Sequence, residues 1–151
     1  MAFIKYLIIL IILCSCNEPM QKTHVIRLKP GQDLKKELQA FAEKNELDAA
    51  WIITCAGSLT RYHIRFANQQ QGAVAEGHFE MVSLTGILSR NGSHIHISVS
   101  DSTGYTTGGH LLDGNIIYTT AEIVIGSSDE LVFKREKDGT TRWEELVIRK
   151  K

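Results

Sequence analysis

The sequence predicts an α+β fold: a single compact domain with a mostly antiparallel or mixed β-sheet of about seven strands and one main helix. One amphipathic helical segment stands near the start, and most later segments alternate polar and apolar residues with the period of a strand. Asn91–Gly92 and Asp138–Gly139 are strong hairpin signals, so the strands that flank them are expected to pair antiparallel. The length of the expected mature part, residues 16–151, suits one domain with a real core.

The expected helix follows a first strand over residues 24–28 and a turn at Pro30–Gly31. Asp33 can accept hydrogen bonds from the first-turn amides as the N-cap. The apolar residues that follow recur on one helical face, with charged residues on the other: Leu34, Leu38, Phe41 and Ala42. The helix is expected to end near Asn45.

The next segments predict one buried and one half-buried strand. Residues 49–56 are continuously apolar with β-branched residues at the centre, which indicates a strand buried on both faces and broken by Gly57–Ser58. Residues 61–66 alternate polar and apolar, and His63 is expected to be a surface residue of that strand. Residues 68–77 predict a polar loop.

Five further strands are expected in the second half of the chain, over residues 78–89, 94–100, 116–126, 131–136 and 142–148. Residues 111–115 are expected to form a short helical or turn segment. So many strands leave sheet edges, and an oligomer that covers them would be a natural solution.

Three of the six histidines, His94, His96 and His110, stand close together in the sequence. In residues 94–100 every second residue is apolar, so His94 and His96 share one face of a strand, roughly 6.6 to 7 Å apart along it. Two imidazoles at that spacing can lean toward one metal ion. The alternative is that both are merely solvated or hydrogen bonded on a polar strand face.

His110 follows a glycine-rich stretch that contains Gly104 and Gly108–Gly109. A permissive backbone there is expected to fold as a loop and present a third ring to the first two. Three histidine ligands leave one coordination position open, which is typical of catalytic or exchangeable zinc sites. The predicted cofactor is therefore a divalent metal, with zinc as the first choice.

The front of the chain predicts a lipoprotein signal peptide over residues 1–15. Lys5 precedes an apolar run over residues 6–13, which is too short for a membrane span but suits the apolar region of a secretory signal. The run leads into Cys16 through Leu-Cys-Ser, which resembles a lipobox. Cys16 is then the lipidated first residue of the mature chain, and residues 16–21 are a tether.

Lipidation predicts a membrane-anchored protein of the bacterial cell envelope, on the periplasmic or surface side. The alternative is an ordinary secreted protein in which Cys16 is incidental. Loss of the signal removes Lys5 from a balance of 17 basic and 17 acidic residues, leaving a net charge of about −1. Without a strongly basic patch, nucleic acid is an unexpected partner. Cys55 would be the one remaining unmodified cysteine, a small buried apolar residue without a disulfide.

Several separated motifs resemble the PPC (plants and prokaryotes conserved) domain in the same order. They are residues 77–86, 94–98 with Asp101, 108–114 and 118–125. The resemblance implies a PPC domain over residues 22–149, a compact α+β fold and a homotrimer. In plants the domain follows an AT-hook in nuclear DNA-binding proteins, but the Arg-Gly-Arg-Pro core of that motif does not occur in these residues. The prokaryotic form carries the histidines, which strengthens the metal hypothesis.

Three functions stay open at this point. The first is a metal-binding module that binds or senses an unknown small molecule, and the second is a metal-dependent hydrolase or lyase that uses the same histidines. For the second, a general acid or base is needed, and the candidate carboxylates are Glu80, Asp101 and Glu122, with Asp113 beside them. Asp101 can instead shape a turn or orient a ligand ring, and the glutamates can merely face solvent. The third is DNA binding, as in the AT-hook members.

Overall fold

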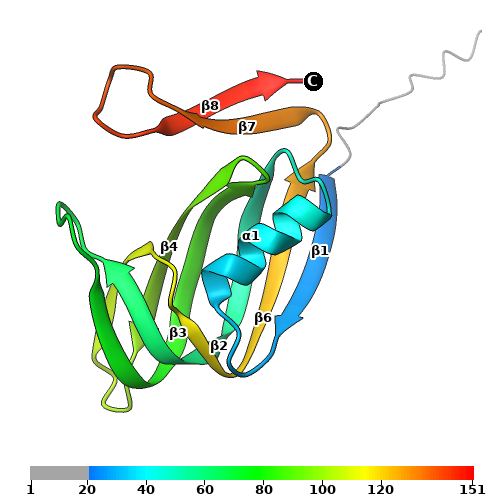
Figure 1. Cartoon of the computed structure of the whole chain (residues 1–151). Helices are drawn as coiled ribbons and strands as arrows, with labels where there is room; N and C mark the ends of the chain where they lie inside the picture. Colours follow the sequence, from blue (N-terminus) through cyan, green and yellow to red (C-terminus); the bar gives the residue numbers. More distant parts are fainter. Residues whose placement is uncertain (1–20) are drawn as a thin grey trace, which may run out of the picture.

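The computed structural model describes residues 21–151 (Figure 1). The predicted signal peptide, Cys16 and all of the tether except Gln21 lie outside these residues. The elements in chain order are β1 (Gln21–Leu28), α1 (Leu34–Lys44), β2 (Ala50–Arg65), β3 (Ala73–Ser89), β4 (Gly92–Ser100), β5 (Thr106–Leu111), β6 (Ile116–Ser128), β7 (Leu131–Glu136) and β8 (Glu145–Lys150). The main sheet has the order β1-β6-β2-β3-β4-β5, and every pair in it is antiparallel. The prediction of a mostly antiparallel sheet with one helix is confirmed.

Helix α1 begins and ends where the sequence predicts. The Asp33 carboxylate accepts a hydrogen bond from the amide of Lys35 at 3.2 Å, and Asn45 is the C-cap. Leu34, Leu38 and Ala42 are buried on one face of the helix. This face covers one side of the main sheet (Figure 1), so the helix closes the core.

Strand β2 does not break at Gly57–Ser58, and that prediction is wrong. Gly57 has a φ of 154°, and a Cβ on it would lie 2.2 Å from the carbonyl oxygen of Thr120 on β6. The glycine therefore permits the backbones of β2 and β6 to approach each other closely. The pairing of these two strands continues past Gly57 with a shift in register between Gly57 and Leu59. One long strand replaces the two that were predicted.

Gly108 and Gly109 lie in strand β5 and not in the predicted loop, whereas Gly104 lies in the turn that precedes this strand. Strand β5 pairs with β4 on one side, while on the other Ile64 and Arg65 of β2 face Leu111 and His110. Since β2 also pairs with β3 and β3 with β4, these four strands close into a ring. A Cβ on Gly109 would lie 2.5 Å from the carbonyl oxygen of Arg65, so this glycine allows β5 to fit between its neighbours.

The predictions for two connecting segments had different outcomes. The polar loop is shorter than residues 68–77, because β3 begins at Ala73. Residues 112–115 form the connection between β5 and β6, as expected of a turn. Asn115 is fully buried there, and its amide donates to the carbonyls of His63 and Leu112 at 3.0 and 2.6 Å.

Strands β7 and β8 form a separate hairpin beyond the end of the main sheet (Figure 1). The predicted antiparallel hairpin is confirmed, but residues 137–144 form a loop in place of a tight turn at Asp138–Gly139, and β8 starts three residues later than residues 142–148 suggest. Phe133 fixes the hairpin: its amide donates to the carbonyl of Asp48 at 2.8 Å, and its carbonyl accepts from Ser89 and Asn91, each at 3.2 Å. The position of the hairpin is thus set by the body of the domain.

Two further findings concern the described residues. No helix within residues 21–151 has the length and apolar character needed to cross a membrane. Cys55 is a free, half-buried thiol, and burial raises its pKa to about 11. It therefore stays protonated at neutral pH and is a poor nucleophile.

Candidate metal centre and its pocket

The three histidines predicted as metal ligands come together on neighbouring strands. His94 and His96 lie on one face of β4, and the β4–β5 register sets His110 directly opposite His96. The Nδ1 atom of His110 lies 3.0 Å from Nε2 of His96 and 3.3 Å from Nε2 of His94. One ligand atom from each residue falls within 4.8 Å of the other two.

This geometry fits a tetrahedral metal. With zinc–nitrogen bonds of 2.0 to 2.1 Å, two ligand nitrogens of a tetrahedral site lie about 3.3 Å apart. The two measured separations are close to that value, and all three side chains offer a nitrogen, a donor that zinc accepts. His94, His96 and His110 can therefore hold a divalent metal while one position remains for another ligand.

The surroundings of the histidines favour neutral imidazole, the form that binds metal. Burial lowers the pKa of His94, with a smaller effect from the positive charge of Arg135, while Glu145 acts in the opposite direction. Burial also lowers the pKa of His110, again assisted by a cation, Arg65. The two lowered values reduce the competition of protons with metal at these rings.

Arg65 lies in the same row of cross-strand neighbours as His96 and His110. Across three neighbouring strands, His96 faces His110 and His110 faces Arg65. Directly opposite residues of an antiparallel pair project on the same side of the sheet. Arg65 therefore shares a face with the two rings.

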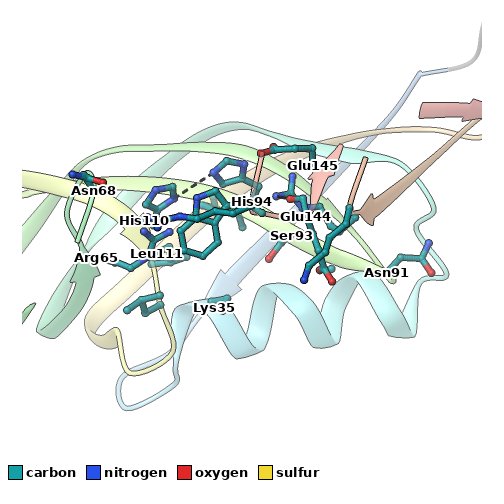
Figure 2. Close-up of a pocket in the computed structure, with 17 residues that line it drawn as sticks. Lys35, Arg65, Asn68, Asn91, Ser93, His94, His110, Leu111, Glu144 and Glu145 are labelled. Atoms are coloured by element: carbon teal, nitrogen blue, oxygen red, sulfur yellow. Dashed lines mark hydrogen bonds between the residues drawn. The ribbon is translucent and has the colours of Figure 1, made fainter. Parts of the chain in front are cut away.

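A pocket of about 820 Å³ lies beside this face. Figure 2 shows His94 and His110 facing one another, with Glu145 on the His94 side and Arg65 on the His110 side. Helix α1, strands β2, β4 and β5, and the β7–β8 hairpin all supply lining residues. The charged ones are Lys35, Arg65, Arg135, Lys137, Arg142, Glu144 and Glu145, and Trp143 stands among them.

The carboxylates predicted as acid or base candidates lie elsewhere. Asp101 shapes the turn after β4, because its Oδ1 accepts from the Thr103 amide at 2.8 Å and the Tyr105 amide at 3.1 Å. The Thr103 bonds are the main cause of its lowered pKa. Glu80 faces Ser100 across the β3–β4 pair, and Glu122 faces Arg27 across the β1–β6 pair. Glu80, Asp101 and Glu122 are not among the residues that line the pocket.

Two further predicted residues have ordinary hydrogen-bonding roles. Asp113 pairs with Lys35, whose Nζ lies 3.0 Å from its Oδ1. His63 has Nδ1 at 2.7 Å from the carbonyl oxygen of Asp113, to which the ring donates. His63 is not part of the histidine cluster, in agreement with its prediction as a non-ligand.

The sequence did not indicate that charged and aromatic side chains of the hairpin lie beside the histidines. Glu145 and Trp143 lie in a segment predicted only as a strand, and nothing in their spacing points to His94. The Asp138–Gly139 signal predicts a hairpin but not where it packs. That position depends on the hydrogen bonds of Phe133, which no local pattern indicates.

Fold and site together define a small antiparallel-sheet domain in which three histidines lie close enough to one another to hold one metal ion. The chain belongs to the Plants and Prokaryotes Conserved (PCC) domain family, whose model matches residues 17–129. This is the family, abbreviated PPC above, that the sequence motifs resemble, and the resemblance is confirmed. The β7–β8 hairpin lies beyond the matched range.

Two curated relatives are much longer than this chain. The bifunctional protein GlmU of Synechococcus sp. (strain JA-3-3Ab) is 42% identical over 129 residues, which are 85% of this chain and 21% of GlmU. The AT-hook motif nuclear-localized protein 13 of Arabidopsis thaliana is 28% identical over 116 residues, 69% of this chain and 26% of the plant protein. The chain thus spans only about a fifth to a quarter of their lengths.

Solved structures share the fold. A hypothetical protein from Salmonella cholerae-suis is 39% identical with a TM-score of 0.86, and the match covers 89% of this chain and 98% of that one. The metal-containing protein AF0104 from Archaeoglobus fulgidus is 24% identical with a TM-score of 0.72, covering 86% and 95%. The first match covers a larger share of this chain than the residues 17–129 that the family model matches.

Proposed function

We propose that this PPC-domain protein binds a divalent transition metal, with zinc as the first choice, through His94, His96 and His110. The observation that carries the proposal is the pair of nitrogen separations, 3.0 and 3.3 Å, at the spacing of tetrahedral ligands. A metal-containing relative with the same fold gives further support. The open position then takes a small molecule, so the domain acts as a binding or sensing module.

The test is the metal content of the purified full chain, measured by mass spectrometry after exposure to equimolar zinc and gel filtration. Wild type is expected to retain about one zinc per chain, and the double variant His94→Ala, His96→Ala none. His78→Ala is the matched control, since His78 packs against Tyr118 and lies outside the cluster. Equal zinc content in wild type and the double variant would remove the proposal.

A metal-dependent hydrolase or lyase is the second candidate. Zinc on three histidines supplies an electrophilic centre that can activate water or polarise a carbonyl. The observation in favour is Glu145, a carboxylate that lines the same pocket. Its negative charge acts to raise the pKa of His94, so it lies near that ring. Turnover of an ester or phosphoester that is lost in Glu145→Gln, while zinc is retained, would support this candidate. Equal turnover in the variant would contradict it.

DNA binding is the third candidate, and it is favoured by the name of the plant relative. The cations around the pocket are the groups available to phosphates. Retention on duplex DNA that falls steeply with salt would support it. Identical migration of the DNA with and without protein at low salt would exclude it.

Envelope anchoring and self-association complete the proposal. The support for lipidation of Cys16 is the sequence of residues 1–16 alone, and transfer of a Cys16→Ser variant from the membrane to the soluble fraction is the expected result. A homotrimer would cover apolar side chains that the isolated chain exposes on its strands, such as Val25 and Val82. Sedimentation of the chain at the mass of a monomer would contradict the trimer.

A further inference from the structure

We propose that the pocket beside the histidines binds a small organic anion, whose carboxylate or phosphate group is held by Arg65 and Arg142 and points toward the metal. This rests on the proposed function, because the anion would occupy the open coordination position. The inference concerns the class of molecule that the pocket accepts. Three observations carry it: the charge of the lining, the arrangement of the guanidinium groups and the size of the space.

The lining is positively charged although the chain is not. The whole sequence has 17 basic and 17 acidic residues. Five basic and two acidic side chains line the pocket, and one of the five, Lys35, is paired with Asp113. The excess of cations is therefore a local property of this pocket, and it favours an anion.

The guanidinium groups are arranged around one aromatic ring. Arg65 and Arg142 lie 5.3 and 4.9 Å from the centroid of the Trp143 ring. Arg65 also faces His110 across the β2–β5 pair. The contacts with Trp143 hold two planar cations in the wall of the pocket, and one of them, Arg65, lies next to His110. Such groups bind carboxylate and phosphate oxygens with two parallel hydrogen bonds.

The size of the pocket and its aromatic residue indicate an organic ligand. Pockets for small molecules measure about 300 to 1,000 Å³, and this one has about 820 Å³, far more than an inorganic oxyanion fills. Trp143 is 48% exposed, and the half-buried Leu112 also lines the space. These side chains offer apolar surface to the remainder of the molecule.

Phenyl phosphate and benzoate are suitable probes, with benzylamine as the cation of similar shape. Binding is measured by isothermal titration calorimetry on the zinc-loaded full chain, and the zinc content of each sample is determined separately. At least one of the two anions is expected to bind and benzylamine is not, and the relative affinities distinguish a phosphate from a carboxylate ligand. The double variant Arg65→Gln, Arg142→Gln is expected to bind the anion at least about tenfold more weakly with zinc retained.

The matched control is Arg149→Gln, an arginine of the same hairpin that pairs with Glu136 and does not line the pocket. Arg142→Gln alone is the second variant, and it leaves intact the hydrogen bond that Arg65 donates to the carbonyl oxygen of Gln69. Absence of binding by both anions to the zinc-loaded chain overturns the pocket proposal and leaves the metal site intact. So does an unchanged affinity in both arginine variants. If wild type holds no zinc, anion binding that depends on Arg65 and Arg142 still supports the pocket.

Discussion

The Nδ1 atom of His110 lies 3.0 Å from the Nε2 atom of His96, on the residue directly opposite it in the neighbouring strand. Strand pairing therefore sets this contact, and the side chains need no mobile loop to meet. A site held by paired strands keeps its geometry before the metal arrives. The predictions below follow from this arrangement and from the contacts that support it.

Loss of one ring should weaken the site without unfolding the domain. His110→Ala leaves two nitrogen ligands on β4, and we expect zinc affinity to fall at least about 100-fold. A competition titration against a zinc-binding dye measures the change. His78→Ala should leave the affinity as it is, and an unaltered affinity in His110→Ala would show that His110 is not a ligand.

Metal should stabilise the folded chain, because the three ligands are brought together only by folding. At free zinc about 100 times Kd, the free energy of unfolding rises by about 2.7 kcal/mol, which is several degrees in Tm for a domain of this size. Scanning calorimetry with zinc and with a chelator measures the difference. The His94→Ala, His96→Ala double variant should give one Tm under both conditions, and a zinc-dependent shift in it would contradict the assignment.

Gly109→Ala should damage both stability and metal binding. The added Cβ would lie 2.5 Å from the Arg65 carbonyl oxygen, so β5 must move and carry His110 with it. We expect a loss of about 1 to 3 kcal/mol and weaker zinc binding. Gly104→Ala is the control: its φ of 85° strains alanine but nothing lies within 4 Å, so stability should fall by about 1 to 2 kcal/mol with zinc affinity unchanged.

Asp48 should make stability depend on acid pH. Its carboxylate lies 2.6 Å from Lys151 and 2.7 Å from Arg90, and the side chain is 7% exposed. The hydrogen bond to Lys151 is the main cause that lowers the pKa of Asp48 in the folded chain. The stabilisation is therefore present above the unfolded pKa, about 3.9, and is lost as pH falls below it through the folded value.

The test compares Asp48→Asn with wild type by urea unfolding from pH 7 to pH 3. At pH 7 we expect the variant to be less stable by about 1 to 3 kcal/mol, and the difference should shrink as the solution becomes more acidic. Glu46→Gln is the control, since Glu46 is exposed and lies 3.9 Å from the same Arg90. A constant difference across the pH range would show that the charge of Asp48 does not contribute.

Local patterns were sufficient to predict the helix and the placement of two of the three histidines in the cluster. The cap at Asp33 and the apolar period of α1 act within a few residues, and alternation alone placed His94 and His96 on one face. The expected break at Gly57 failed because the reason for that glycine, the Thr120 carbonyl, is distant in sequence. The sequence shows that residue 57 is a glycine, but it does not show which backbone atom of another strand packs against it.

The pocket could not be predicted for a similar reason. Its hairpin wall is positioned by hydrogen bonds between Phe133 and residues of the body, Asp48, Ser89 and Asn91, which are contacts between distant parts of the chain. The glycines before His110 predicted flexibility, whereas they serve close packing of β5 between two strands. Where the hairpin packs, and whether the glycines before His110 form a loop or a strand, thus depend on tertiary contacts that the local sequence does not specify.

Most of the side chains around the pocket come from two separate parts of the chain, the ring of strands β2 to β5 and the β7–β8 hairpin. The nitrogens that would hold a metal belong to β4 and β5, while Arg142, Trp143 and Glu145 belong to the hairpin. Substitutions between β7 and β8 can exchange the side chains presented to a ligand and leave the imidazole geometry untouched. Selectivity can thus diverge between related chains while the metal chemistry is inherited unchanged.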